Sequence, residues 1–235
     1  MATAAPDFQR YAVYYVPNGD ALARFGAAWL GWDITTGTTC AHPDNLDLDI
    51  AIAHITASPR RYGLHATIVP PFRLADGMDQ PALEQLLSGI AAASAPVELN
   101  ALELARLGRF LALVPEGAAE ALNRLAAFWL VGSDPMRAPP LPADLERHRA
   151  RPLTPAQDAL LNRWGYPYVM EAFKCHITLT GKLPKAQARA VADHLEPVLA
   201  PLLPRPFRIR QLALVGEDRD GWFHVIRQYD LGAKA

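Results

Sequence analysis

Two short apolar segments of the sequence, LHATI and CHITL, each carry a histidine two residues before a threonine: His65 with Thr67, and His176 with Thr178. In an extended strand, residues i and i+2 point to the same face. Each segment is therefore predicted to show an imidazole and a hydroxyl on one side and apolar side chains on the other. A single short motif of this kind is weak evidence. Two copies at equivalent places in two similar halves would bring two imidazoles to one cleft.

Two facing imidazoles suit the cleavage of a phosphodiester. One group must take a proton from the attacking oxygen, and another must protonate the leaving oxygen. Histidine suits both roles because its pKa lies near neutrality. Threonine hydroxyls and a nearby cation can hold the non-bridging oxygens while negative charge develops. Each of the two histidines stands without a carboxylate or a cysteine ligand set beside it, so the pattern favours catalysis without a metal, and no cofactor is expected.

A third match, His54 with Thr56, is interpreted as coincidental. It lies in the segment 46–56, which is predicted to be a short helix, and residues i and i+2 of a helix do not share a face. Pro59 follows closely, and the other half of the chain holds no counterpart.

Three further side chains near the motifs are candidates for substrate binding. Alternation places Lys174 on the same face as His176, where it could bind phosphate, and Arg61 and Tyr62 precede the first motif and could line the cleft. The alternative for each is a solvated surface side chain. The positive charge of Lys174 would disfavour a second one on its neighbour, so His176 is predicted to be the more acidic histidine and the base.

A basic, Pro-rich segment over residues 137–151 could cover an anionic substrate with Arg137, Arg147 and Arg149. We predict that this segment is irregular. A charged run of this kind is more often a solvated loop than a binding surface.

The predicted elements repeat once along the chain. Each half shows a strand, a helical segment, a His-x-Thr strand, a helix and a hairpin. The first half has these at 11–16, 21–30, 63–69, 80–92 and 97–114. The second half has helices at 117–131, 154–164 and 184–199, a motif strand at 173–181, and hairpin strands at 207–215 and 222–229. The strand at 110–114 closes the first hairpin and also matches the strand at 11–16.

This order predicts an α+β fold formed by internal duplication. We expect one bilobal domain over residues 1–235, with pseudo-repeat halves at about 10–114 and 110–230 and with interleaved lobes. Two antiparallel sheets would face a central cleft, with the helices outside. A single mixed sheet remains an alternative.

Composition restricts the partners. The chain has 235 residues, of which 51% are hydrophobic and 20% are charged, and its net charge is -1. This charge provides no general electrostatic attraction to extended nucleic acid, and no apolar run reaches the length of a membrane span. Two cysteines do not make a disulfide framework or a metal-ligand spacing. We therefore expect a cytoplasmic protein with a small phosphorylated substrate and no membrane partner; the sequence leaves the oligomeric state open.

Three stretches carry a resemblance to known families: residues 10–17 (RYAVYYVP), 59–72 (PRRYGLHATIVPPF) and 164–181 (WGYPYVMEAFKCHITLTG). The two His-x-Thr strands resemble the two-histidine (2H) phosphoesterase superfamily, which includes RNA ligase-like cyclic phosphodiesterases. The chain is similar, more closely, to a bacterial family of phosphonate-metabolism proteins of unknown function, encoded beside carbon–phosphorus lyase genes.

The resemblance implies a bilobal fold with a cleft in which His65, Thr67, His176 and Thr178 form the phosphate site. Val69 departs from the pattern, because we expect relatives to carry lysine there. The missing charge would then come from Lys174 or Arg61.

The expected function is that of a metal-independent cyclic phosphodiesterase acting on a small ribosyl or nucleoside cyclic phosphate in phosphonate metabolism. One alternative is a binding protein that senses a phosphorylated ligand without turnover. Another is an enzyme that opens 2',3'-cyclic phosphates at RNA ends.

Overall fold

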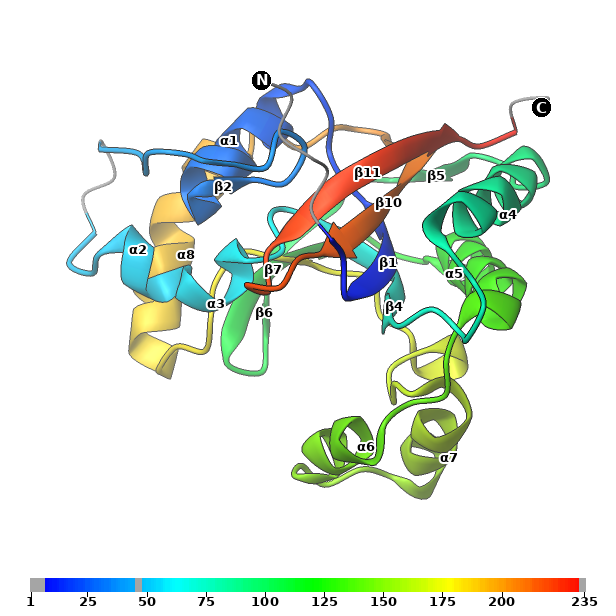
Figure 1. Cartoon of the computed structure of the whole chain (residues 1–235). Helices are drawn as coiled ribbons and strands as arrows, with labels where there is room; N and C mark the ends of the chain where they lie inside the picture. Colours follow the sequence, from blue (N-terminus) through cyan, green and yellow to red (C-terminus); the bar gives the residue numbers. More distant parts are fainter. Residues whose placement is uncertain (1–6, 45–47, 233–235) are drawn as a thin grey trace.

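The structure is a computed structural model that describes residues 7–44 and 48–232. Its centre is a seven-stranded sheet with the strand order β11-β10-β1-β4-β8-β7-β6, and every neighbouring pair in it is antiparallel (Figure 1). The strands are β1 (Arg10–Tyr15), β4 (Ala66–Phe72), β6 (Leu102–Leu107), β7 (Phe110–Pro115), β8 (Ile177–Thr178), β10 (Gln211–Glu217) and β11 (Phe223–Asp230). Two small sheets pair β2 (Trp32–Asp33) with β3 (Thr38–Thr39), and β5 (Val97–Leu99) with β9 (Phe207–Ile209).

Eight α-helices are formed by the described residues, and several begin where a capping residue predicts. They are α1 (Ala21–Leu30), α2 (Ile52–Ile55), α3 (Ala57–Arg60), α4 (Gln80–Ala92), α5 (Glu120–Ser133), α6 (Pro142–Arg149), α7 (Pro155–Trp164) and α8 (Lys185–Leu199). Asp20 caps α1 by accepting from the Ala23 amide, and Thr154 forms a capping box with Gln157 at the start of α7. The predicted starts of these two helices are confirmed.

The α+β class is confirmed, but the prediction of two sheets facing a cleft is wrong. The two motif strands, β4 and β8, pair directly through Ala66 and Ile177, so the strands of both halves join into one sheet. The order is symmetric about this junction: β1 and β7 flank the motif strands, and β10 and β6 lie beyond them. As predicted, β7 has the same place beside β8 that β1 has beside β4.

Four other segments differ from their predictions. The long strands expected at 97–107 and 207–215 are each interrupted, and their first parts pair with each other as β5 and β9. The segment 137–151 is not wholly irregular, because it contains α6. The helix expected at 46–56 is reduced to α2, followed by α3; residues 46 and 47 lie outside the described residues.

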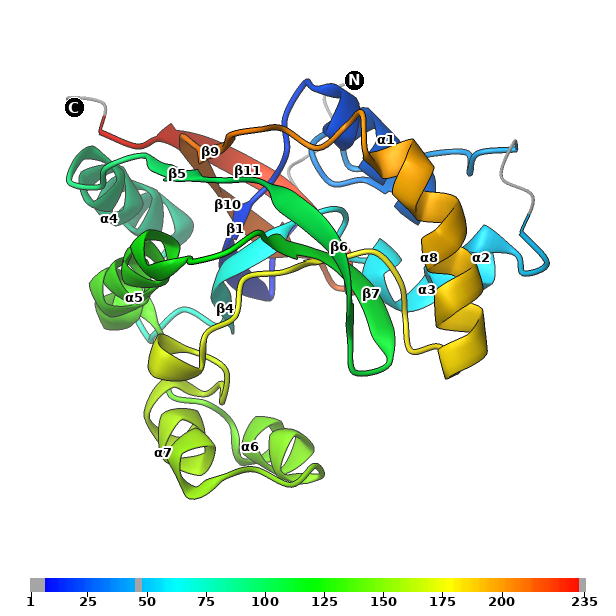
Figure 2. The same ribbon diagram turned by 180° about the vertical axis from the view of Figure 1, so that it is seen from behind.

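The main core lies on one face of the sheet, where α1, α4, α5 and α8 contribute large buried side chains. Figures 1 and 2 show α4 and α5 together at one end of the sheet and α1 and α8 at the other. Trp29 of α1 is fully buried, and its indole donates to the Leu179 carbonyl at 2.8 Å, which ties α1 to the segment after β8. The opposite face carries a smaller apolar cluster that includes Tyr14 and Phe223.

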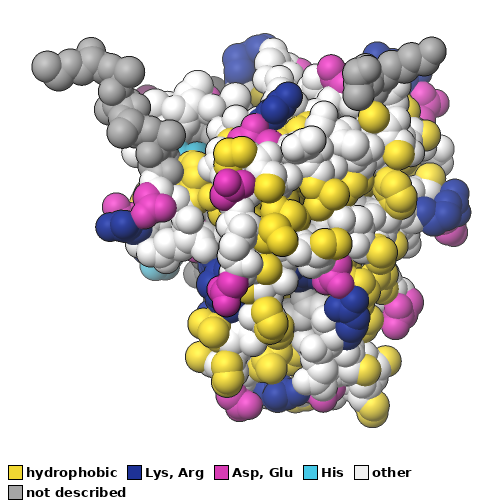
Figure 3. Space-filling view, turned by 45° about the vertical axis from the view of Figure 1, so that its right-hand side comes forward, with side chains coloured by type: hydrophobic (Ala, Val, Ile, Leu, Met, Phe, Trp, Pro, Cys, Tyr) yellow, Lys and Arg dark blue, Asp and Glu magenta, His cyan; other side chains and the backbone are white. Residues whose placement is uncertain are grey.

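Helices α6 and α7 project from one edge of this body (Figure 1). Figure 3 brings the side with α4 to α7 forward and shows hydrophobic side chains scattered between charged ones over it. Phe128 and Val131 of α5 are among the exposed apolar residues. None of the helices in the described part of the chain combines the length and the apolar character that a membrane span requires.

Candidate active site

Both His-x-Thr motifs line one pocket of about 360 Å³. Since Ala66 and Ile177 belong to the main core, their alternating neighbours on β4 and β8 face the other side of the sheet, where the pocket lies. Arg61 and Tyr62 also line it, as the sequence led us to expect. The remaining lining residues are Arg10, Tyr14, Pro71, Tyr166, Glu217, Gly221 and Phe223.

The register between the motif strands places the four side chains in a pseudo-twofold arrangement. Ala66 lies opposite Ile177 in an antiparallel pair. One residue to either side, the same register sets His65 beside Thr178 and Thr67 beside His176. Each histidine position therefore lies across the strand boundary from the threonine position of the other motif, and all four residues line the pocket.

Both imidazoles are held in the same tautomer by backbone carbonyls. Nδ1 of His65 lies 3.0 Å from the Gly63 carbonyl oxygen, and Nδ1 of His176 lies 2.8 Å from that of Lys174. A carbonyl oxygen only accepts, so Nδ1 carries the proton in each ring. The neutral form of either histidine thus keeps Nε2 available to accept a proton.

His65 is buried between aromatic rings. Its ring stacks on Tyr14 at 3.8 Å between centroids and meets Tyr62 edge-on at 5.4 Å, while Nε2 lies 3.1 Å from the Thr67 hydroxyl. Burial lowers the pKa of His65 to about 4; the Gly63 hydrogen bond opposes this shift, and a charge on His176 adds to it. His65 is therefore neutral at pH 7.

Gly63 is needed for this geometry. Its φ is +61°, a conformation that side chains disfavour, and a Cβ placed there would lie 2.7 Å from the Cβ of Ile34. A larger residue at this position would have to move the carbonyl that orients His65. Nothing in the sequence pattern had pointed to this role of Gly63.

His176 is more open than His65. It is partly exposed, its ring centroid is 5.8 Å from that of Phe110, and no described residue hydrogen-bonds its Nε2. The prediction that Lys174 makes His176 the more acidic histidine is not supported, because the lowered pKa belongs to His65 and arises from burial. The Lys174 side chain is exposed and does not line the pocket. Strand alternation fails there because β8 begins only at Ile177.

Val69 also lies away from the pocket. The pairing of β1 with β4 shifts register between Val13, opposite Val69, and Tyr14, opposite Thr67. This irregularity turns both Ile68 and Val69 into the main core, so lysine at position 69 would be buried there. With this register, the absence of a lysine at position 69 removes no charge from the pocket.

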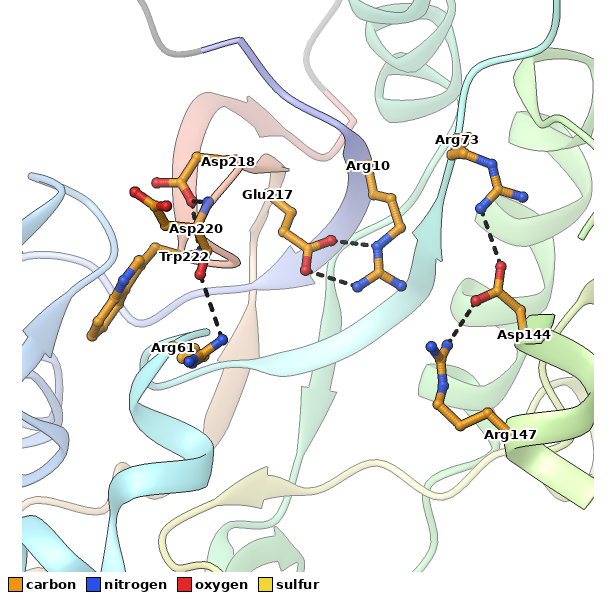
Figure 4. Close-up of polar contacts among 9 residues, drawn as sticks. All are labelled: Arg10, Arg61, Arg73, Asp144, Arg147, Glu217, Asp218, Asp220 and Trp222. Carbon is orange, nitrogen blue, oxygen red and sulfur yellow. Dashed lines mark hydrogen bonds and ion pairs between the residues drawn. The ribbon is translucent and has the colours of Figure 1, made fainter. Parts of the chain in front are cut away.

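The cations at the pocket are arginines. Arg61 is exposed, and its guanidinium lies 3.4 Å from the Asp220 carbonyl oxygen, which leaves most of its donors unused (Figure 4). Arg10 forms a bidentate pair with Glu217, which raises the pKa of Arg10 through that hydrogen bond against the effect of burial. From the sequence, Tyr14 was expected only as part of the strand 11–16, and Arg10 only as the first residue of the stretch 10–17 that carries the resemblance. The alternation that places Val13 in the core predicts that Tyr14 faces the opposite side.

The third motif and Cys175 lie outside the pocket. His54 is exposed on α2, and the buried Thr56 hydroxyl donates to the Ile52 carbonyl, so this third motif takes no part in the pocket. Within residues 7–44 and 48–232, no three histidine, cysteine or acidic side chains gather as a metal-ligand set. Cys175 points into the core, as expected, and burial raises its pKa to about 12.

Among solved structures, the chain resembles Escherichia coli LigT in complex with NADP+, with a TM-score of 0.45 and 13% identity over 97% of this chain and 100% of that one. It also resembles the protein TT0787 of Thermus thermophilus, with a TM-score of 0.44 and 15% identity over 96% of this chain and 100% of that one.

Two curated relatives are both called ribose 1,5-bisphosphate phosphokinase PhnN. That of Janthinobacterium sp. (strain Marseille) is 33% identical over 94% of this chain and 50% of its own length. That of Laribacter hongkongensis (strain HLHK9) is 37% identical over 78% of this chain and 44% of its own length. The chain thus spans about half the length of the curated relatives it matches. A family model matches residues 67–224, about two thirds of the chain, and we conclude that the chain belongs to the family described as "Protein of unknown function (DUF1045)".

Proposed function

We propose that this protein is a metal-independent cyclic phosphodiesterase that hydrolyses a small ribosyl or nucleoside cyclic phosphate, in phosphonate metabolism. The observation that carries the proposal is the pair of imidazoles in one pocket, each with Nδ1 donating to a backbone carbonyl, together with the two motif threonines that line the same pocket. A pocket of about 360 Å³ suits a small ligand.

In the proposed reaction, His65 is the base. Its neutral Nε2 takes a proton from a water molecule, the water oxygen attacks phosphorus, and a new P–O bond forms. The P–O bond to one ring oxygen breaks on the opposite side, and His176, in its protonated form, gives a proton to that oxygen. One water is consumed, and the product carries a phosphomonoester and a free hydroxyl. Proton exchange with solvent restores both histidines.

Other groups in the pocket would stabilise the transition state. The hydroxyls of Thr67 and Thr178 can turn toward the non-bridging oxygens, and Arg61 supplies positive charge from the pocket rim. The anionic ligand would also raise the low pKa of His65, since a nearby negative charge favours the protonated ring. The base would then hold the proton it has accepted more strongly than the empty pocket allows.

The names of the curated relatives fit a ribosyl substrate. Hydrolysis of a 1,2-cyclic phosphate on ribose 5-phosphate, with cleavage at O2, would yield ribose 1,5-bisphosphate, which is named in the activity of both relatives. The proposed reaction would therefore supply the substrate of such a kinase.

A panel of cyclic phosphates, including ribose 1,2-cyclic phosphate and 2',3'-cyclic nucleotides, tests the proposal when product formation is followed by ³¹P NMR. The wild-type protein should open at least one of them with EDTA present. His65→Ala and His176→Ala should each lower the rate by about 10²–10⁴-fold. His54→Ala is the matched control, because His54 belongs to the third motif and lies outside the pocket. Binding of these compounds without turnover by the wild-type protein would instead identify a sensor.

A further inference from the structure

A second pocket adjoins the candidate active site. Its volume is about 220 Å³, and it shares Arg10, Pro71 and Tyr166 with the pocket of the two histidines. Its far wall is formed by residues of α6 and by the residues at the end of α7, so the projecting helices bound this second pocket.

Positive charge dominates this second pocket. Four arginines line it together with His148, and the lining holds a single carboxylate, that of Asp144: the arginines are Arg10, Arg73, Arg137 and Arg147. Asp144 is shared between two of them, with oxygens 3.1 Å from Arg73 and 2.9 Å from Arg147 (Figure 4). These two arginines and one carboxylate leave one positive charge uncompensated.

Arg137 is buried with incomplete compensation. Its side chain is 8% exposed, its nearest carboxylate is Asp134 at 3.6 Å, and that carboxylate is held more closely by Arg163 at 2.6 Å. One terminal nitrogen donates to the Trp164 carbonyl, but Nε has no partner among the described residues. A buried guanidinium in this state is destabilising unless another anion offsets its charge.

We propose that the second pocket binds a second phosphate of the same substrate whose cyclic phosphate lies between the two histidines. This inference rests on the proposed function. Arg147 uses one terminal nitrogen on Asp144 and has further donors that suit phosphate oxygens, whereas Arg73 adds positive charge while its terminal nitrogens contact Asp144 and the Pro139 carbonyl. The buried charge of Arg137 favours a dianion beside it. The substrate class is then a small sugar that carries a cyclic phosphodiester and a separate phosphomonoester. Arg10 lies between the two phosphates, held in place by Glu217.

The test compares ribose 1,2-cyclic phosphate with and without a phosphate on O5. The wild-type protein should have at least about a 10-fold higher kcat/KM for the compound with the O5 phosphate, since charge-assisted hydrogen bonds contribute on this scale. Arg147→Gln should raise KM for that compound by about 10-fold, with little change in kcat, and should leave the other compound unaffected. Arg147 is suited to substitution because its side chain is 62% exposed on α6.

Arg151→Gln is the control. Arg151 lies two residues after the end of α6, is exposed and does not line either pocket. The variant makes the same change in net charge as Arg147→Gln. It should behave like the wild type with both compounds. Circular dichroism and thermal unfolding should show that both variants are folded.

Equal kcat/KM for the two compounds, with no effect of Arg147→Gln on KM, would overturn the inference and leave the proposed function intact. The second pocket could instead bind a free anion and not a phosphate of the substrate. In that case, added inorganic phosphate should change the turnover of the compound that lacks the O5 phosphate, and kcat/KM should again be equal for the two compounds. This outcome would also overturn the inference. If neither compound is hydrolysed, the proposed function fails, but calorimetric titration can still test the second pocket. In that case the inference requires that His65→Ala binds the compound with the O5 phosphate more tightly than the compound without it. The double variant His65→Ala/Arg147→Gln should lose this difference in affinity.

Discussion

The two His-x-Thr motifs hold their imidazoles in the same tautomer but in different surroundings. His65 is buried, stacked on Tyr14 and met edge-on by Tyr62, whereas His176 is partly exposed. Burial removes water from the charged form of His65, which lowers its pKa to about 4. A duplicated motif can therefore provide both a neutral acceptor and a more open, solvated partner without any difference within the motif itself.

The difference arises on the neighbouring strands. On β1, Tyr14 lies opposite Thr67; on β7, the equivalent position opposite Thr178 is Ala112. The tyrosine ring reaches across to cover His65, and an alanine has no side chain that could cover His176 in the same way. One cross-strand position thus makes the two halves of the site unequal.

The largest expected effect is on the rate of hydrolysis, whose pH dependence should distinguish the roles of the two histidines. The wild-type rate should follow a bell-shaped profile, because one imidazole must be neutral and the other charged. In kcat/KM, the acid limb should lie well below pH 6.5, since the free pocket lowers the pKa of His65 to about 4. His65→Ala should lose the acid limb and His176→Ala the alkaline limb of a residual rate that is about 10²–10⁴-fold lower. The limbs of the wild type belong to the coupled pair. Loss of the acid limb in His176→Ala instead would exchange the two roles.

The next effect is on stability. Between pH 6.5 and about 4, the unfolded chain binds a proton at His65 and the folded chain does not. The contribution of His65 to the free energy of unfolding is therefore complete above pH 6.5 and is lost as the pH falls through this window. The slope is at most about 1.4 kcal/mol per pH unit. Urea unfolding at several pH values should show a weaker dependence in His65→Gln than in the wild type. His176→Gln serves as the comparison, and an equal change in both variants would contradict the buried-histidine explanation.

A substitution at Gly63 should act on one motif alone. Gly63→Ala introduces a side chain at positive φ and in contact with Ile34, so we expect a loss of about 1–3 kcal/mol in unfolding free energy and a lower kcat. At the equivalent place, Lys174 contributes its backbone carbonyl to His176, and its side chain is exposed. Lys174→Ala should therefore retain stability and most activity. Chemical denaturation measures the stability of each variant, and steady-state kinetics measures its activity. Equal losses in Gly63→Ala and Lys174→Ala would contradict the proposed difference between the two motifs.

The smallest effect tests the aromatic cover directly. Tyr14→Ala should admit water to His65 and raise its pKa toward 6.5 by about one unit or more, as followed by NMR titration of the imidazole. Tyr14→Phe keeps the ring and should keep the low pKa. If Tyr14→Ala is folded and the pKa of His65 does not rise, the stacking ring is not the cause of the shift.

Much of this protein was determined locally by its sequence. Alternation on the segments LHATI and CHITL indicated the side chains that share a face, and both motifs do line one pocket. Asp20, with Thr154 and Gln157, marked helix starts through side chains that satisfy nearby amides. The membership in a bacterial family, expected from three longer stretches, was confirmed. Apart from the meeting of the two motifs in one pocket, these features depend on residues close together in the chain.

The tertiary structure decided what depends on pairing between distant strands. The Ala66–Ile177 pair joined two expected sheets into one, and the register shift at Val69 turned a residue from the pocket to the core. Lys174 left the pocket because β8 is too short to carry the alternation back to it. The burial of His65 depends on Tyr14, which is 51 residues away in the chain. Register and burial are set by contacts across the sheet, and such contacts leave no periodic signal in either segment.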